Sequence, residues 1–180
     1  FLLQPVGRCA IIKPVINMDN VILIGMPGSG KSTCGILTAK LLCKKFVDTD
    51  LIIQQHEGMK LQQIINTKGN TYFAACEQRY VCELKTDNSV IATGGSVVYS
   101  DAAMQHLRGL GKIIYLEISL QEMKRRISNL KTRGILLKDG YTLDDMYRER
   151  AALYERYADH TVHCGGSIEA TAHAIVALVE

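Results

Sequence analysis

The chain has 180 residues, of which 47% are hydrophobic and 22% are charged, as in one globular domain with a sizeable buried core. Its 21 lysines and arginines against 18 aspartates and glutamates leave a net charge of +3, which gives no reason to expect a nucleic-acid partner. The apolar runs, such as residues 21–24, fall far short of the roughly 20 residues that span a bilayer, so we expect no membrane association.

Residues 18–180 are expected to form one domain, preceded by an extension of unknown role at residues 1–17. Short apolar runs predict strands at residues 21–25, 46–47, 90–93 and 112–117, and a weaker strand at 161–163. Apolar residues at helical spacing predict helices at residues 32–45, 51–56, 61–67, 70–85, 101–108, 121–130, 143–158 and 167–179. This alternation predicts a three-layer α/β/α fold whose central parallel sheet has about five strands.

A glycine-rich segment, Gly25 to Ser32, joins the first predicted strand to the first predicted helix. It fits the phosphate-binding pattern G-x-x-x-x-G-K-[ST], in which backbone N–H groups and a helix N-terminus surround the phosphates. Lys31 would reach the β- and γ-phosphates, and the hydroxyl of Ser32 would hold Mg²⁺. The alternative is a glycine-rich turn with a chance lysine. The residues expected to bind a nucleoside triphosphate are Gly28, Ser29, Gly30, Lys31, Ser32 and Thr33.

Two carboxylates, Asp48 and Asp50, follow the second predicted strand. They lie where ligands of α/β proteins bind, at the carboxyl edge of the sheet. One can hold a metal ion, and the other can accept the proton of an acceptor hydroxyl. The alternative is that one aspartate caps the next helix and the other is solvated.

Two more motifs are Thr93-Gly94-Gly95, after the third predicted strand, and Arg150-Ala151-Ala152-Leu153-Tyr154 in a late helix. Together with the phosphate-binding loop and Asp48-Thr49-Asp50, they resemble the motifs of the shikimate kinases. The resemblance implies a P-loop kinase fold, similar to that of nucleoside-monophosphate kinases, with a mobile lid at about residues 130–141. It also implies ATP and Mg²⁺ as cofactors, and the phosphorylation of a small hydroxylated substrate, shikimate, to shikimate 3-phosphate.

The resemblance also implies a role for each matching residue. Ser32 and Asp48 are similar to the magnesium partners, and Asp50 is similar to the catalytic base that contacts the acceptor hydroxyl. Lys31 and a lid arginine would stabilise the transferring phosphate. The remaining positions are Gly94 and Gly95 in the acceptor pocket, Arg126 on the adenine ring, Arg133 in the lid and Arg150 on the acceptor carboxylate. The alternative for Arg126 and Arg133 is an ordinary exposed charge.

The chain departs from the family pattern at three positions that concern the acceptor. Ala74 stands where shikimate kinases have an arginine that grips the substrate carboxylate, a loss of about 2–3 kcal/mol of binding free energy. Ser96 replaces a third glycine, and Gly134 replaces a proline, which would loosen the lid. Arg79 lies on another helical face from Ala74. A kinase for a different hydroxylated acceptor and a non-catalytic nucleotide-binding module are therefore the alternatives.

The six cysteines lack the spacing of zinc ligands, and most lie in apolar stretches, so we expect free thiols in a reducing cytoplasm. We also expect a monomer.

Overall fold

A computed structural model describes residues 20–128, 134–138 and 140–180. The predicted extension, residues 1–17, and the lid arginine Arg133 lie outside the described residues. The order of elements, with the bounds of each, is β1 Asn20–Ile24, α1 Lys31–Leu41, β2 Lys45–Asp48, α2 Thr49–Glu57, α3 Leu61–Glu83, β3 Ser89–Ala92, the 3₁₀ turn η1 Val97–Tyr99, α4 Asp101–Leu110, β4 Gly111–Glu117, α5 Leu120–Ser128, α6 Leu143–Tyr157, β5 His160–His163 and α7 Ile168–Val179.

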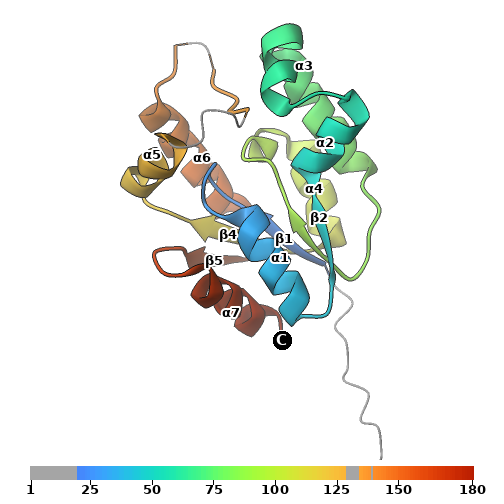
Figure 1. The fold of residues 1–180 in the computed structure, drawn as a ribbon, viewed down its shortest axis with the longest axis vertical. Helices are drawn as coiled ribbons and strands as arrows, with labels where there is room; N and C mark the ends of the chain where they lie inside the picture. Colours follow the sequence, from blue (N-terminus) through green and yellow to red (C-terminus); the bar gives the residue numbers. More distant parts are fainter. Residues whose placement is uncertain (1–19, 129–133, 139) are drawn as a thin grey trace, which may run out of the picture.

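The strands form one parallel sheet in the order β2-β3-β1-β4-β5, which confirms the predicted α/β architecture. β1 lies at the centre with every residue buried, as its unbroken apolar run requires. Helices α1 and α7 pack against each other on one face, while α4 and α6 contact β4 from the other face (Figure 1). All five strands therefore end at one edge, and the functional residues predicted after β1, β2 and β3 meet there.

Two predicted boundaries were wrong for local reasons. The first helix ends at Leu41 rather than Lys45, because Cys43 adopts a φ of 53° that interrupts it, and Lys45 begins β2. The helices predicted at 61–67 and 70–85 form the single element α3, with a non-helical Gly69 (φ 84°) between its two parts. A kink at glycine lets both halves keep their apolar faces toward the protein.

A second, smaller apolar cluster holds α2 and α3 together. It contains Ile53, Leu61, Ile64, Phe73 and Leu136. Leu136 comes from the predicted lid, so this segment is packed against the α2–α3 region (Figure 1). None of the helices in the described residues is long and apolar enough to cross a bilayer.

Candidate active site

A cavity of about 550 Å³ opens at the carboxyl edge of the sheet. It brings together segments that are far apart in the sequence: the phosphate-binding loop, the start of α2, the start of α3, the turn after β3 and the predicted lid. Its lining includes nine residues of these segments: Gly28, Gly30, Lys31, Ser32, Asp48, Asp50, Lys60, Gly95 and Gly134. Seven of these nine are residues that the sequence predicted to bind nucleotide, metal or acceptor.

The phosphate-binding loop depends on glycines with backbone angles that other residues rarely adopt. Gly25, Gly28 and Gly30 have φ values of 146°, 80° and 96°. A Cβ on Gly25 would lie only 2.5 Å from the backbone oxygen of Leu116, so the chain could not pass β4 with a side chain there. Gly30 directly precedes α1, whose first N–H groups have no partner within the helix and face an incoming anion.

Lys31 is 92% buried at the start of α1, and its ammonium is held by the loop itself. Its Nζ donates to the backbone oxygens of Gly25 (2.8 Å) and Met26 (2.9 Å), and to Oγ of Ser29 at 3.5 Å. These contacts keep a buried positive charge at the centre of the concave loop, which is where a phosphate chain needs it.

Asp48 fulfils the helix-capping alternative and also lines the cavity. Its Oδ1 accepts hydrogen bonds from the backbone N–H groups of Asp50 (3.0 Å) and Leu51 (3.4 Å), and so caps α2. Asp48 lines the cavity together with Ser32, so the cap fixes a carboxylate close to the phosphate-binding loop.

Asp50 points toward the glycine turn after β3. Its Oδ1 lies 2.8 Å from the point that a Cβ on Gly94 would occupy, and Oε1 of Glu77 lies 2.2 Å from the same point. Only a glycine allows these two carboxyl groups to approach the turn so closely. The N–H of Gly94 donates to Oγ1 of Thr49 at 3.2 Å, which ties this turn to the start of α2.

Glu77 is a buried carboxyl group beside the turn at Gly94 that was not predicted from the sequence. It is 97% buried on α3, and Oε1 has no hydrogen-bond partner among the described residues. Burial raises the pKa of Glu77 to about 7; the nearby Asp50 raises it too, while the Ser96 hydrogen bond, Arg150 and Lys31 act in the opposite direction. The signal was its position: Glu77 falls on the same helical stripe as Phe73 and Cys76, which are buried.

Ser96 uses its hydroxyl to hold Glu77. The Ser96 Oγ donates to Oε2 of Glu77 at 2.6 Å, and both side chains are buried. The departure of Ser96 from the family pattern therefore adds a hydrogen bond to a buried carboxyl group that forms no ion pair with any described residue. On α3, Ala74 is exposed and brings no charge.

Gly95 lies between the phosphate-binding loop and α6. Its Cβ position would be 3.0 Å from Pro27 and 3.3 Å from Nη1 of Arg150, and its oxygen accepts a 2.6 Å hydrogen bond from Tyr154. Arg150 is 99% buried, does not line the cavity, and donates to Tyr99 Oη (3.3 Å) and to the oxygen of Leu136 (2.5 Å). Predicted as the ligand of the acceptor carboxylate, Arg150 is covered by the lid segment in this structure.

Gly134 has a packing role that the sequence did not indicate. A Cβ on Gly134 would lie 2.9 Å from Cβ of Leu61 and 3.0 Å from the backbone nitrogen of Gln62. The lid segment is held further by Asn70, whose Nδ2 donates to the oxygen of Leu137 at 2.9 Å. This glycine therefore allows the predicted lid segment to approach the start of α3, and Gly134 and Ile135 line the cavity.

A second cavity of about 180 Å³ lies on the other side of the phosphate-binding loop. Arg126 of α5 lines it, donates from Nη1 to the oxygen of Gly28 (3.0 Å) and pairs with Glu122 at 2.6 Å. Arg126 is thus packed on the loop rather than being an ordinary exposed charge.

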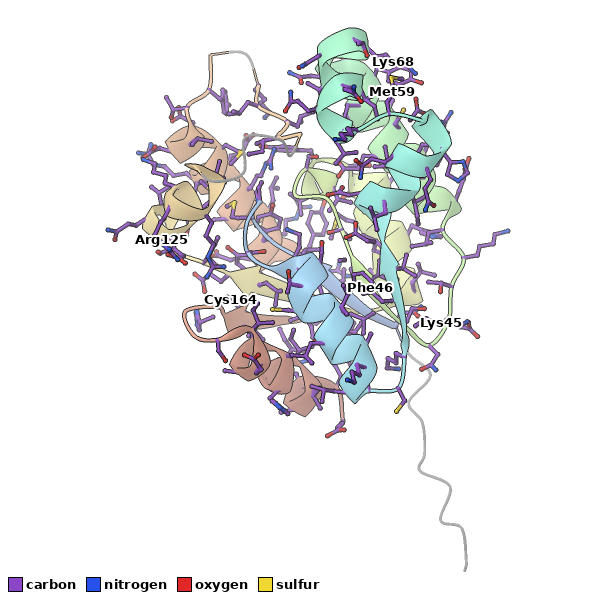
Figure 2. The ribbon with its side chains drawn as sticks, in the orientation of Figure 1. Lys45, Phe46, Met59, Lys68, Arg125 and Cys164 are labelled. Atoms are coloured by element: carbon purple, nitrogen blue, oxygen red, sulfur yellow. The ribbon has the colours of Figure 1, made fainter. Side chains whose placement is uncertain are left out.

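The same cavity is also lined by Cys164, which lies between β5 and α7 (Figure 2), and by Ile168, an exposed apolar residue that was not predicted from the sequence to be part of a site. The phosphate-binding loop and the start of α1 contribute further lining residues: Ser29, Gly30 and Thr33.

Comparison with known proteins agrees with these features. The family model for shikimate kinase matches residues 27–180. The chain belongs to the shikimate kinase family. It is 36% identical to a shikimate kinase of Clostridium botulinum (strain Loch Maree / Type A3) over 163 residues, covering 88% of this chain and 95% of the relative. It is 39% identical to that of Pseudomonas paraeruginosa over 148 residues, covering 81% and 86%.

Solved structures of family members share the fold. The shikimate kinase from Acinetobacter baumannii in complex with shikimate superposes with a TM-score of 0.82 at 26% identity, covering 91% of this chain and 94% of that one. The enzyme from Aquifex aeolicus gives 0.75 at 28% identity, covering 88% and 94%. Family membership confirms the prediction of an ATP-dependent kinase acting on a small molecule, over that of a non-catalytic nucleotide-binding module.

Proposed function

We propose that this shikimate kinase family member transfers the γ-phosphoryl group of ATP to a hydroxyl of shikimate, giving ADP and shikimate 3-phosphate. One observation carries the proposal. Asp50 lines the same cavity as Lys31 and Ser32, and its carboxylate faces the turn at Gly94. A base and a phosphate-binding loop that share one cavity are what direct transfer to a hydroxyl needs.

The nucleotide would bind with its phosphates in the loop and its base in the second cavity. The N–H groups at the start of α1 and the ammonium of Lys31 would contact the phosphate oxygens, with Lys31 exchanging the backbone oxygens that it binds now. The base would pack between Arg126 and Ile168, which line that cavity together.

The residues near the loop fit Mg²⁺. Ser32 and Asp48 offer a hydroxyl and a carboxylate, and this ion prefers a few oxygen ligands of protein while keeping waters and phosphate oxygens. When bound, Mg²⁺ neutralises charge on the phosphates. Within residues 20–128, 134–138 and 140–180, no group of three or more His, Cys, Asp or Glu side chains is arranged to hold a metal ion.

In the reaction, Asp50 would accept the proton of the acceptor hydroxyl. The hydroxyl oxygen would form a bond to the γ-phosphorus while the bond between that phosphorus and the oxygen of the leaving ADP breaks. Lys31 would stabilise the charge that collects on the oxygens of the transferring group, together with Arg133 of the lid. Gly94 and Gly95 would leave room for the acceptor next to Asp50, and Arg150 would contact its carboxylate once the lid segment releases the guanidinium.

A second acceptor class is favoured by Ala74. The arginine of the family pattern is replaced on α3 by the exposed Ala74, so this position does not supply the planar donor pair that suits a carboxylate. A hydroxylated metabolite with one carboxylate or none would then be the substrate.

The deciding experiment measures ADP release with ATP and each acceptor in turn: shikimate, polyols, hydroxy acids and nucleosides. We expect turnover with millimolar shikimate, and no turnover there would contradict the proposal. Ala74→Arg is expected to lower the KM for shikimate by roughly 30- to 150-fold if the rest of the pocket suits it, since one charge-assisted contact is worth about 2–3 kcal/mol. A lower KM for an uncharged polyol than for shikimate would favour the second acceptor class.

We further propose that the enzyme works as a monomer in the cytoplasm. The described cysteines, Cys34, Cys43, Cys76, Cys82 and Cys164, are free thiols, as expected in a reducing compartment. Sedimentation at micromolar concentration, with and without ATP, tests the oligomeric state.

A further inference from the structure

The cavity contains a cation that no part of the proposed mechanism uses. Among the described residues that line it, the positively charged side chains are Lys31 and Lys60. Lys31 is buried in the phosphate-binding loop and bound to its backbone oxygens. Lys60 is exposed at the rim, beside the start of α3. Figure 2 labels the preceding residue, Met59, where α2 meets α3 at the top of the molecule.

The ammonium of Lys60 makes no hydrogen bond or ion pair with any residue in the described part of the chain, and only its backbone N–H is engaged, by Oε1 of Gln63 at 3.1 Å. By contrast, Lys68, eight residues further along α3, is paired with Glu57 at 2.9 Å. A charge left at the edge of a cavity without a protein partner is available to a ligand.

Other cations that could replace the missing arginine at position 74 are engaged elsewhere. Arg79 binds Oη of Tyr80 (2.6 Å) and Glu57 (3.4 Å) and does not line the cavity. Arg150 is buried beneath the lid segment and donates to Leu136. Neither presents its charge to the cavity in this structure.

Lys60 also occupies a position where lysine is unfavourable for the fold. It is the N-cap of α3, and it makes no side-chain cap hydrogen bond there. A Ser, Thr, Asp or Asn at an N-cap stabilises a helix by about 0.5–2 kcal/mol, whereas a positive charge is repelled by the helix dipole. A residue that lowers stability and borders a cavity is more readily explained by a contact with substrate.

We infer that Lys60 selects a carboxylate-bearing acceptor, by placing its ammonium at the rim of the cavity, where no other described lining side chain besides the buried Lys31 is positively charged. The inference rests on the proposed phosphorylation of shikimate, because it names how the same cavity recognises the substrate's acidic group. Asp50 and Gly95 line the cavity with Lys60, so one small acceptor can bring its hydroxyl to Asp50 while its carboxylate meets the lysine.

The test compares Lys60→Gln and Lys60→Arg with a matched control, Lys85→Gln. Lys85 is an exposed lysine after α3, at the opposite edge of the sheet from the cavity, where β3 begins. The substrates are shikimate and its methyl ester, which keeps the ring and hydroxyls but loses the charge. Steady-state kcat and KM are measured for each acceptor and for ATP, and binding of shikimate is measured by calorimetry with a non-hydrolysable ATP analogue.

Lys60→Gln is expected to raise the KM and the dissociation constant for shikimate about tenfold, with the KM for ATP changed less than twofold. The methyl ester should be used equally well by the wild type and the variant. Lys60→Arg should retain most of the affinity, Lys85→Gln should match the wild type, and Ala74→Arg in the Lys60→Gln protein should restore binding. Added salt should raise the KM for shikimate in the wild type more than in Lys60→Gln.

Two different results separate the failure of this inference from failure of the proposed function. If the wild type phosphorylates shikimate and Lys60→Gln behaves like Lys85→Gln, the role of Lys60 is wrong and the proposed function stands. If the wild type neither binds nor phosphorylates shikimate, both are overturned.

Discussion

The phosphate-binding loop and the acceptor side of the cavity are built in different ways. The loop is one short segment, Gly25 to Ser32, whose shape comes from backbone angles and whose contacts are mostly made by backbone atoms. The predicted acceptor side is assembled from segments far apart in the sequence, namely α2 with Asp50, the start of α3 and the turn at Gly94 and Gly95, and the buried carboxyl group of Glu77 lies behind that turn. Substitutions such as Ala74 can therefore change which acceptor binds while the loop still binds phosphate.

The sharpest way to separate the two sides is Asp50→Asn. The amide keeps the shape of the side chain but accepts no proton, so kcat should fall by about 10²–10⁴-fold, the usual contribution of a general base. The KM for ATP should change by less than about twofold, because the loop is untouched. Asp87→Asn, at an exposed site paired with Lys45, is the control and should leave both constants unchanged. A kcat within fivefold of the wild type would remove Asp50 from the role of base.

The next largest effect is expected from Gly94→Ala. The added methyl group would overlap Oε1 of Glu77 and crowd Oδ1 of Asp50, at 2.2 and 2.8 Å, so the free energy of unfolding should fall by about 3 kcal/mol. The matched control is Gly109→Ala on α4, where a Cβ meets nothing within 4 Å. This control should raise stability by about 0.5–1 kcal/mol, because alanine favours the helix. Urea unfolding measures both, and equal stability of the two variants would contradict the crowding.

The acceptor side should also make stability depend on pH through Glu77. Burial raises its pKa from 4.5 to about 7, so the folded protein binds more protons than the unfolded chain between these values. The contribution of Glu77 to stability is therefore full below pH 4.5 and is lost as the pH rises through 7. From pH 5 to pH 8 this loss should be about 2–3 kcal/mol.

Glu77→Gln removes that titration while keeping the shape of the side chain and an acceptor for Ser96. Between pH 5 and pH 8, the free energy of unfolding should decrease in both proteins by different amounts. The decrease for Glu77→Gln should be about 2–3 kcal/mol smaller than the decrease for the wild type. Glu83→Gln, an exposed position at the end of the same helix, should follow the wild type. Parallel curves for Glu77→Gln and the wild type would show that Glu77 is not protonated in the folded state.

The contrast between the two sides also explains what the sequence could predict. Local patterns determine the strands, the order of strands and helices along the chain, and the phosphate-binding loop. The structure and the comparisons confirm the fold that these patterns predicted. The close approach of Gly134 to Leu61 and the cover that Leu136 places over Arg150 depend on contacts between distant segments, so no local pattern contained them. The end of α1 was missed because Cys43 adopts a left-handed conformation that its residue type does not indicate.

The position of Glu77 was only partly predictable from the sequence. Its place on a buried helical stripe was visible in the sequence, since Phe73 and Cys76 precede it at helical spacing, but its approach to Asp50 was not. A carboxyl group on an apolar stripe is a sequence signal for a buried, functional or strained group, because burying a charge without a partner costs several kcal/mol.

The smallest expected effect falls on the nucleotide side. Arg126→Ala should raise the KM for ATP about three- to tenfold, because Arg126 packs on the loop at Gly28 and borders the second cavity. Arg125→Ala is a closely matched control: the neighbouring arginine also pairs with Glu122, but its side chain is 70% exposed on the outer side of α5 (Figure 2) and does not line the cavity. Since both variants lose an ion pair with Glu122, that loss cancels in the comparison. A KM for ATP that is equal in the two variants would mean that the nucleotide base binds somewhere other than the second cavity. A changed KM for shikimate in Arg126→Ala would mean that the nucleotide side and the acceptor side are coupled.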